Sequence, residues 1–147
     1  MVFFAGIGPF AVEIEKKAKP AKIIAVEINP HAVDYMWKNI QLNKCRLIEV
    51  VLGDVKDAVD DYHGVCDRVI MPLPEMSMDY VDDAIRCLKP RGVCHFYCFS
   101  GEDLDEKKNK INEAAKRLRK KMRFLHAQKV LPYGPKIWKY RIDFEVL

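Results

Sequence analysis

Short, nearly continuous apolar runs recur along the first hundred residues and predict five strands, at residues 2–5, 22–27, 47–52, 68–71 and 93–99. Between them, apolar positions at helical spacing predict helices at about residues 9–17, 30–43 and 81–88. Buried strands that alternate with amphipathic helices are typical of a mostly parallel sheet with helices on both faces. We therefore expect an α/β fold.

The last third of the chain follows a different pattern. A highly charged segment predicts a long helix from about Leu104 to Met122. Two strands are expected after it, at residues 124–131 and 137–146, and apolar and charged residues alternate strictly in the second. Because the residues between them, Pro132-Tyr133-Gly134-Pro135, are a strong turn signal, the two strands should form an antiparallel hairpin.

Length and composition indicate one globular domain. The chain has 147 residues, half of them apolar, so we expect a single domain over residues 1–147. No apolar run approaches the ~20 residues of a membrane span, and no membrane partner is expected. The five cysteines contain no Cys-x-x-Cys pair, which argues against a disulfide framework and against a zinc site. We therefore expect no metal and a reducing, cytoplasmic location.

The net charge of +4 is unevenly distributed. A basic excess gathers near the end of the charged helix, at Lys116, Arg117, Arg119, Lys120, Lys121 and Arg123. A solvated helix face is the favoured interpretation, and a contact with a phosphate backbone is the alternative.

Candidate chemistry begins at a glycine turn behind the first predicted strand. Gly6 and Gly8 allow the backbone to turn sharply and to approach a ligand closely. Pro9 suits the first turn of a helix, where its missing N–H has no partner to lose. A strand, a bare turn and a helix N-terminus together form a cradle for a polar ligand.

Three further signals follow predicted strands. Glu27 ends the second strand, Gly53-Asp54 follows the third, and Pro72-Leu73-Pro74 follows the fourth. Ligands of open α/β sheets bind at this carboxyl edge. Glu27 can hold a ribose diol, Asp54 can accept a hydrogen bond from an adenine amine, and the glycine turn leaves room for an amino-acid tail.

These motifs resemble those of class I methyltransferases, which bind S-adenosylmethionine on a Rossmann-like fold ending in an antiparallel hairpin. More narrowly, the chain is similar over essentially its whole length to the archaeal and eukaryotic tRNA guanosine-37 N1-methyltransferases. The segments that carry the resemblance are residues 4–10, 27–30, 67–75 and 130–133.

The resemblance implies a role for each motif. The methionine end of the cofactor would be lined by Phe4, Ala5, Gly6, Ile7, Gly8, Pro9 and Phe10. Glu27 would bind the ribose, with Ile28 beside the adenine and Asn29 next in the motif. Asp54 would bind the adenine, with Val55 next to it. The pocket for the methyl acceptor would be shaped by Pro72, Leu73 and Pro74.

The chain departs from the family pattern at three places. Pro72 replaces the usual asparagine, and Val2 stands where an acidic residue is usual. The Pro-Leu-Pro form is similar to that of an archaeal subgroup that also methylates a wyosine intermediate. The third departure lies before the first motif. In the family, the tRNA-binding region and the residues that place guanine and accept its proton stand there, whereas this chain begins at the first motif. The catalytic base is therefore unassigned, and we expect tRNA binding mainly through such an upstream region and little transfer by this chain alone.

Two alternatives stay open. Relatives on the wyosine pathway transfer the aminocarboxypropyl group of the same cofactor, although a different motif after the fourth strand distinguishes them. A non-catalytic module that only binds the cofactor is the second alternative. The sequence leaves the oligomeric state open.

Overall fold

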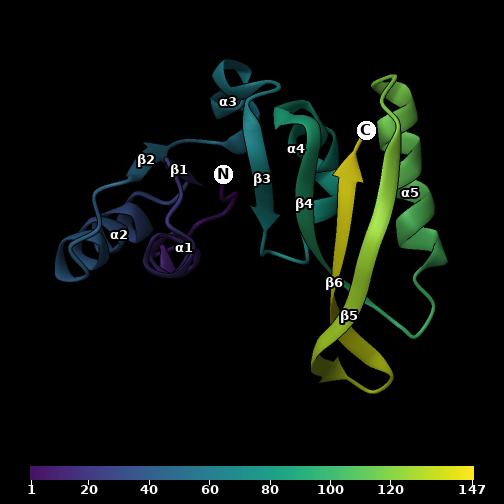
Figure 1. Ribbon diagram of the computed structural model, residues 1–147. Helices are drawn as coiled ribbons and strands as arrows, with labels where there is room; N and C mark the ends of the chain where they lie inside the picture. The colour runs from purple at the N-terminus through teal and green to yellow at the C-terminus, as the bar shows by residue number, and fades with distance from the viewer. The chain divides into compact units, whose positions relative to one another are not determined.

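The computed structural model describes residues 1–147, which form two compact units, residues 1–61 and residues 62–147 (Figure 1). None of the helices is long and apolar enough to cross a membrane.

The first unit is built on a parallel strand pair. Its elements are α1 (Pro9–Ala18), β1 (Ile23–Glu27), α2 (Pro30–Leu42), β2 (Ile48–Leu52) and α3 (Val55–Ala58), before the short 3-10 turn Asp60–Tyr62. The register of β1 and β2 places Ile23 opposite Ile48 and Glu27 opposite Leu52, so both strands end at the same edge. Connections through helices make the pairing parallel, as the sequence predicted.

Helix α2 shows why apolar spacing alone did not define its buried face. Val33, Met36 and Ile40 are buried, whereas Trp37, for which the same apolar spacing predicts burial, is 46% exposed. Trp37 follows Met36 directly, and successive helical residues point about 100° apart. The helix ends at Asn43, and its last carbonyls bond to the amides of Lys44 and Cys45 in a Schellman arrangement.

The predicted strand at residues 2–5 is not formed. Val2 makes a single parallel bridge to Ala25, and pairing stops there because Phe4 adopts a left-handed backbone with φ 51°. Ala5 still donates its amide to the carbonyl of Val26 at 2.9 Å. The segment therefore runs beside β1 as an irregular extension that bends into the glycine turn.

The second unit contains a four-stranded sheet in the order β3-β4-β6-β5. Its elements are β3 (Cys66–Met71), the 3-10 turn Ser77–Tyr80, α4 (Val81–Cys87), β4 (Leu88–Ser100), α5 (Asp105–Arg117), β5 (Met122–Gly134) and β6 (Ile137–Val146). β3 and β4 are parallel, whereas β6 is antiparallel to both β4 and β5. The predicted C-terminal antiparallel hairpin is therefore confirmed.

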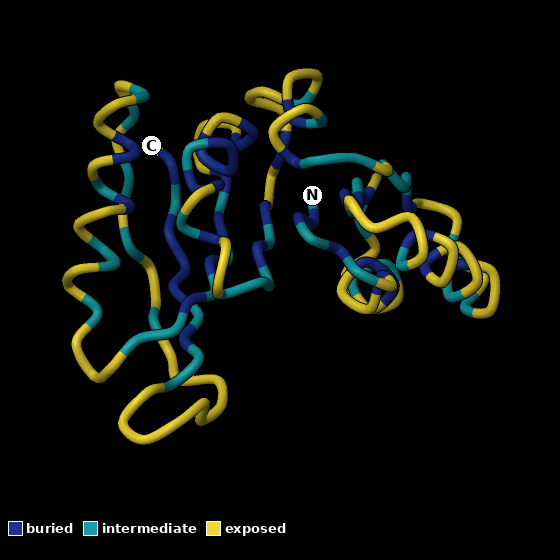
Figure 2. Tube along the Cα trace, turned by 180° about the vertical axis from the view of Figure 1, so that it is seen from behind, coloured by how far each residue is buried: buried dark blue, intermediate teal, exposed yellow.

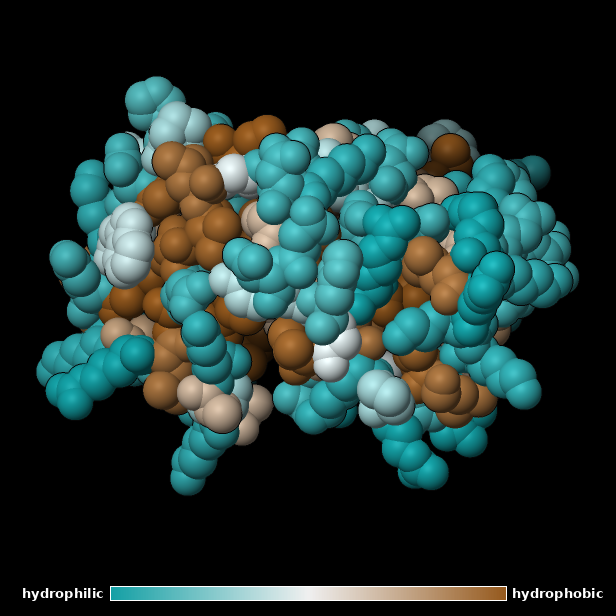
Figure 3. Space-filling model, turned by 90° about the horizontal axis from the view of Figure 1, so that it is seen from above, coloured by the Kyte–Doolittle hydropathy of each residue, from teal (hydrophilic) through white to brown (hydrophobic).

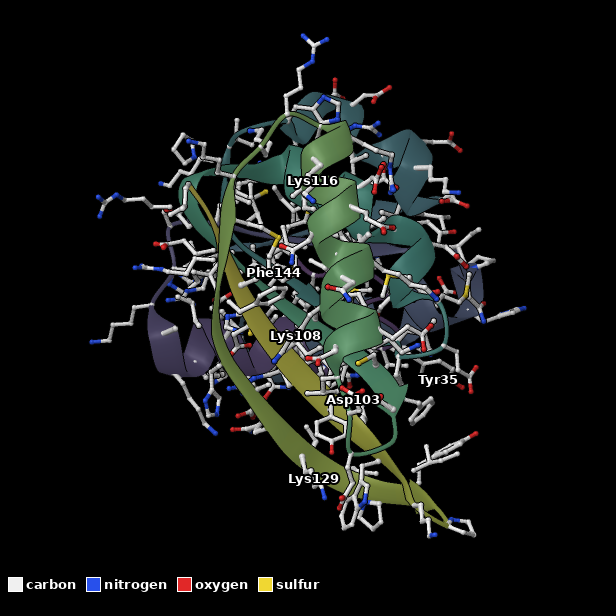
Figure 4. All side chains as sticks on the ribbon, turned by 90° about the vertical axis from the view of Figure 1, so that its right-hand side faces the viewer. Tyr35, Asp103, Lys108, Lys116, Lys129 and Phe144 are labelled. Carbon is white, nitrogen blue, oxygen red and sulfur yellow. The ribbon has the colours of Figure 1, made fainter.

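Helix α5 packs along this sheet, and Figure 4 shows Phe144 of β6 beside it. Phe144, Phe96 of β4 and Ile111 of α5 are fully buried, which accounts for the alternation read in the last strand. In Figure 2 much of β6 and alternate residues of β4 are buried, whereas β5 and the loop of the β5–β6 hairpin are mostly exposed. Cys94 and Cys98 are buried core residues of β4, and burial raises the pKa of the Cys98 thiol to about 11.

Helix α5 is shorter than the sequence predicted. It was expected to reach Met122, but it ends at Arg117. Arg119 has a left-handed φ of 54°, and the amides of Arg119 and Lys120 bond to the carbonyls of Lys116 and Ala115. This Schellman closure satisfies the last carbonyls and turns the chain into β5.

Candidate functional site

The glycine turn joins the irregular N-terminal segment to α1. Gly6 and Gly8 both have positive φ, 57° and 85°, the conformation that glycine adopts without steric cost. The amide of Gly8 donates to the carbonyl of Ala5 at 2.9 Å, which closes the turn. Gly8 is also the N-cap of α1, and no side chain caps this helix. The turn therefore presents backbone amides and a helix N-terminus, as the sequence predicted.

Helix α2 holds this turn in place from one side. A Cβ on Gly8 would lie 2.6 Å from the Cγ of Met36, a buried residue of α2. The side-chain amide of Asn39, one turn further along α2, donates to the carbonyl of Ile7 at 2.9 Å. Asn39 was not singled out from the sequence, because a polar residue on a helix gives no sign of a partner 32 positions away.

Glu27 connects the end of β1 to the turn. Its Oε2 accepts the amide of Gly6 at 2.7 Å, and its Oε1 accepts the amide of Asn29 at 2.8 Å. Each carboxylate oxygen can accept a second hydrogen bond. Glu27 therefore fixes the backbone on both sides of itself and keeps acceptor capacity for a diol.

The end of β2 lies at the same edge. The amide of Gly53 donates to the carbonyl of Glu27 at 2.9 Å. The carboxylate of Asp54 accepts the amide of Lys56 at 2.8 Å and caps α3, whose first residue, Val55, is buried. The glycine turn, Glu27 and Asp54, predicted separately from the sequence, thus occupy one edge of the first unit.

Exposed apolar side chains accompany these carboxylates. Ile28 follows Glu27 and is 62% exposed, and Leu52, which pairs with Glu27 across the strands, is 56% exposed. Figure 3, which shows the molecule from above, has hydrophobic areas between hydrophilic side chains. Apolar side chains beside hydrogen-bond acceptors are suited to a planar base attached to a polar sugar. Asn29 accepts the amide of His31 at 3.0 Å and caps α2, so its side chain already has a local structural role.

In the second unit, Pro72, Leu73 and Pro74 follow the carboxyl end of β3 and are partly buried. The buried hydroxyl of Ser77 lies 2.6 Å from the carbonyl of Leu73 and 3.2 Å from that of Met71. The ammonium of Lys139 donates to the carbonyl of Pro72 at 3.3 Å. The carbonyls of Met71, Pro72 and Leu73 are therefore engaged by two residues that the sequence did not point to.

His95, in the apolar strand β4, has hydrogen-bond partners on both sides of its ring. Its Nδ1 lies 2.8 Å from Asp143 and its Nε2 lies 3.0 Å from the guanidinium of Arg68. Both ring nitrogens are thus engaged. No group of three or more His, Cys, Asp or Glu side chains is placed to hold a metal ion.

Ion pairs compensate part of the basic region around α5. Lys110 pairs with Glu106, Arg117 pairs with Asp82, and Arg123 pairs with Glu145. Lys108 and Lys116 lie along the helix in Figure 4. This pairing favours the interpretation of α5 as a solvated helix face.

We therefore expect the basic end of α5 to contribute little to RNA binding. Replacing Lys116, Lys120 and Lys121 together with glutamine should leave the salt dependence of RNA affinity unchanged, because a solvated helix face has no phosphate contact to lose. Each lost phosphate contact would lower the slope by about 0.7–0.9. Fluorescence anisotropy with labelled tRNA at several salt concentrations measures this slope. A decrease of about 2 or more would instead assign the helix to the RNA interface.

Comparison with known proteins places this geometry in a family. The TRM5/TYW2 methyltransferase domain matches residues 1–124. The chain is 34% identical over 145 residues to the tRNA (guanine(37)-N(1))-methyltransferase Trm5b of Pyrococcus abyssi, covering 97% of this chain and 42% of the relative. It is 31% identical over 142 residues to a tRNA(Phe) (4-demethylwyosine(37)-C(7)) aminocarboxypropyltransferase of Methanocaldococcus jannaschii, covering 95% of this chain and 56% of the relative.

Solved structures give the same result. The crystal structure of M. jannaschii TYW2 in complex with AdoMet superposes with a TM-score of 0.93 at 30% identity, over 99% of this chain and 66% of that one. Trm5b from Pyrococcus abyssi gives a TM-score of 0.87 at 33% identity, over 99% of this chain and 43% of that one.

Parallel strands whose carboxyl edge carries a glycine turn and two carboxylates define a Rossmann-like nucleotide-binding domain. Within that class, the chain belongs to the TRM5/TYW2 methyltransferase domain family. It spans about two fifths to just over half of the length of the curated relatives described above.

Proposed function

We propose that this chain binds S-adenosylmethionine and serves as the methyltransferase domain of a tRNA-modifying enzyme, acting on N1 of guanosine 37. The observation that carries the proposal is the Glu27 carboxylate, which bonds to the amides of Gly6 and Asn29 at the carboxyl edge of β1. The relatedness to tRNA (guanine(37)-N(1))-methyltransferases supports the choice of substrate. We also propose that residues 1–147 act as one domain in the cytoplasm.

The chain's own residues would hold and orient the cofactor. The glycine turn from Phe4 to Phe10 would receive the methionine end, and Glu27 would accept hydrogen bonds from the ribose hydroxyls. Asp54 and Val55 would face the adenine, with Ile28 packed on its plane. When bound, S-adenosylmethionine supplies an electrophilic methyl group. The protein's part is to align that group with the accepting nitrogen.

The segment Pro72-Leu73-Pro74 would shape the acceptor pocket. Two prolines restrict its backbone, and Ser77 and Lys139 hold its carbonyls. A rigid pocket wall favours one orientation of a flipped base and thereby raises the fraction of encounters that react.

A second candidate is transfer of the aminocarboxypropyl group. The 31% identity to an aminocarboxypropyltransferase and the TM-score of 0.93 to M. jannaschii TYW2 favour it. Both reactions use the same cofactor and differ in which carbon–sulfur bond breaks. The cofactor-binding residues therefore do not discriminate between them, whereas the product does.

The mass of the modified nucleoside tests the proposal. The chain is incubated with S-adenosylmethionine and unmodified tRNA carrying guanosine 37, and the nucleosides are analysed by mass spectrometry. Any product above background should be a guanosine carrying one methyl group, in the low yield expected of this chain alone, and a tRNA with adenosine at this position is the matched control. An aminocarboxypropyl product on tRNA that carries the wyosine precursor would support the second candidate instead.

A further inference from the structure

The tip of the β5–β6 hairpin lies at the same edge of its sheet as the proposed acceptor pocket. The last pairing of β6 with β4 joins Trp138 to Ser100, so the hairpin beyond it extends past the end of β4. A two-residue turn at Pro135 and Lys136 closes the hairpin, whose exposed loop is visible in Figures 1 and 2. Because β3 and β4 are parallel, this is also the edge where Pro72 follows β3.

An aromatic platform stands on this tip. The ring of Tyr133 stacks on the ring of Phe99 with centroids 3.9 Å apart and planes inclined by 28°. Phe99 thus supports one face of the tyrosine ring, yet Tyr133 remains 59% exposed. A ring that is fixed from below and open above is suited to stack on an unpaired base, which presents a flat surface of similar size.

Two lysines lie beside the platform. Arg123, Lys129 and Arg141 of the hairpin pair with Glu145, Glu102 and Asp143, whereas no such carboxylate pairs with Lys136 or with Lys139, which stands opposite Phe99 across the strands. Lys136 lies in the turn itself. Lys139 links the hairpin to the pocket, because its ammonium bonds to the carbonyl of Pro72 at 3.3 Å and lies 5.0 Å from the centre of the Tyr97 ring.

We propose that this hairpin tip, formed by Tyr133, Lys136 and Lys139 with Phe99 beneath, binds the RNA strand beside the nucleotide to be modified. An unpaired neighbouring base stacks on Tyr133, and the two lysines lie near the flanking phosphates. An exposed aromatic ring with lysines beside it is typical of surfaces that bind single-stranded nucleic acid. The inference rests on the proposed function for the identity of the RNA as a tRNA loop.

Replacement of Tyr133 tests the stacking contact. The probe is a fluorescently labelled anticodon stem-loop with an unpaired loop of tRNA sequence, titrated with the full chain. Tyr133→Ala should weaken binding by about 5- to 150-fold, the range for loss of one base–aromatic stack. Tyr133→Phe keeps the ring and should bind within about twofold of the unsubstituted chain.

Lysine substitutions separate this surface from general electrostatic attraction. Lys136 has a left-handed φ of 58°. Glycine adopts this conformation readily, so Lys136→Gly removes the charge and should not disturb the turn. It should weaken binding and lower the salt slope by about one phosphate contact. Lys121→Gln, an exposed lysine before the start of β5, removes the same charge and should change neither quantity.

Three results would overturn the inference. They are equal weakening by Lys121→Gln and Lys136→Gly, an unchanged affinity for Tyr133→Ala, and no binding of the stem-loop by the unsubstituted chain. Cofactor binding is measured separately by calorimetry on each variant. If the chain binds the cofactor but the hairpin variants leave RNA affinity unchanged, only the RNA surface is rejected. If the unsubstituted chain does not bind the cofactor, the proposed function is rejected.

Discussion

Replacing Glu27 with glutamine should weaken the binding of S-adenosylmethionine by about 5- to 150-fold. The side chain keeps its size but loses its charge and one of its two acceptor oxygens. One of the amides of Gly6 and Asn29, which now bond to Oε2 and Oε1 at 2.7 and 2.8 Å, would face an NH₂ group. The variant therefore loses a charge-assisted bond to the ribose and loosens the glycine turn at the same time.

Isothermal titration calorimetry with the unsubstituted chain and the variant measures this effect. Glu49→Gln is a matched control, because Glu49 lies on β2 near the opposite end of the strand pair and forms an exposed ion pair with Lys22. It should bind the cofactor as tightly as the unsubstituted chain. Equal affinities for all three proteins would remove Glu27 from the cofactor site.

Replacing Gly8 with alanine should lower the free energy of unfolding by about 2–4 kcal/mol. The new Cβ would lie 2.6 Å from the Cγ of Met36, far closer than van der Waals contact. The backbone would also keep a φ of 85°, which costs an alanine additional energy. Against a total stability of about 5–15 kcal/mol for a typical domain, this loss is large.

Urea denaturation followed by circular dichroism measures the change. Gly6→Ala is the matched comparison, because Gly6 has a φ of 57° and nothing lies within 4 Å of a Cβ built on it. It should lose only about 1–2 kcal/mol, the cost of the left-handed conformation. Combining Gly8→Ala with Met36→Ala should cost less than the sum of the two single changes, since the second relieves the clash made by the first. Equal losses for the two glycine variants would mean that α2 does not restrict the turn.

The alternation of strands and helices could be predicted because each element has its own apolar period. β1, β2, α2 and β6 were found within a residue or two of their bounds. The failures have local causes that periodicity does not encode. The segment at residues 2–5 is broken by the left-handed Phe4, and α5 stops at a Schellman closure made by Arg119 and Lys120, neither of which is a typical helix stop.

The candidate site could be predicted where the chemistry depends on residue type near a strand end. Glycines, a carboxylate after β1 and another after β2 are visible in the sequence, and the first unit brings them to one edge. Asn39, Ser77 and Lys139 could not be found in this way. Each donates to a backbone carbonyl, and many side chains that carry an N–H or O–H group can do so.

Direct titration of S-adenosylmethionine into the folded chain tests the central claim. We expect saturable binding at one site, with the affinity reduced in Glu27→Gln and unchanged in Glu49→Gln. Circular dichroism of the same sample establishes that the chain is folded. A folded chain that shows no binding up to about 1 mM cofactor, an affinity too weak to support the proposed role, would contradict it.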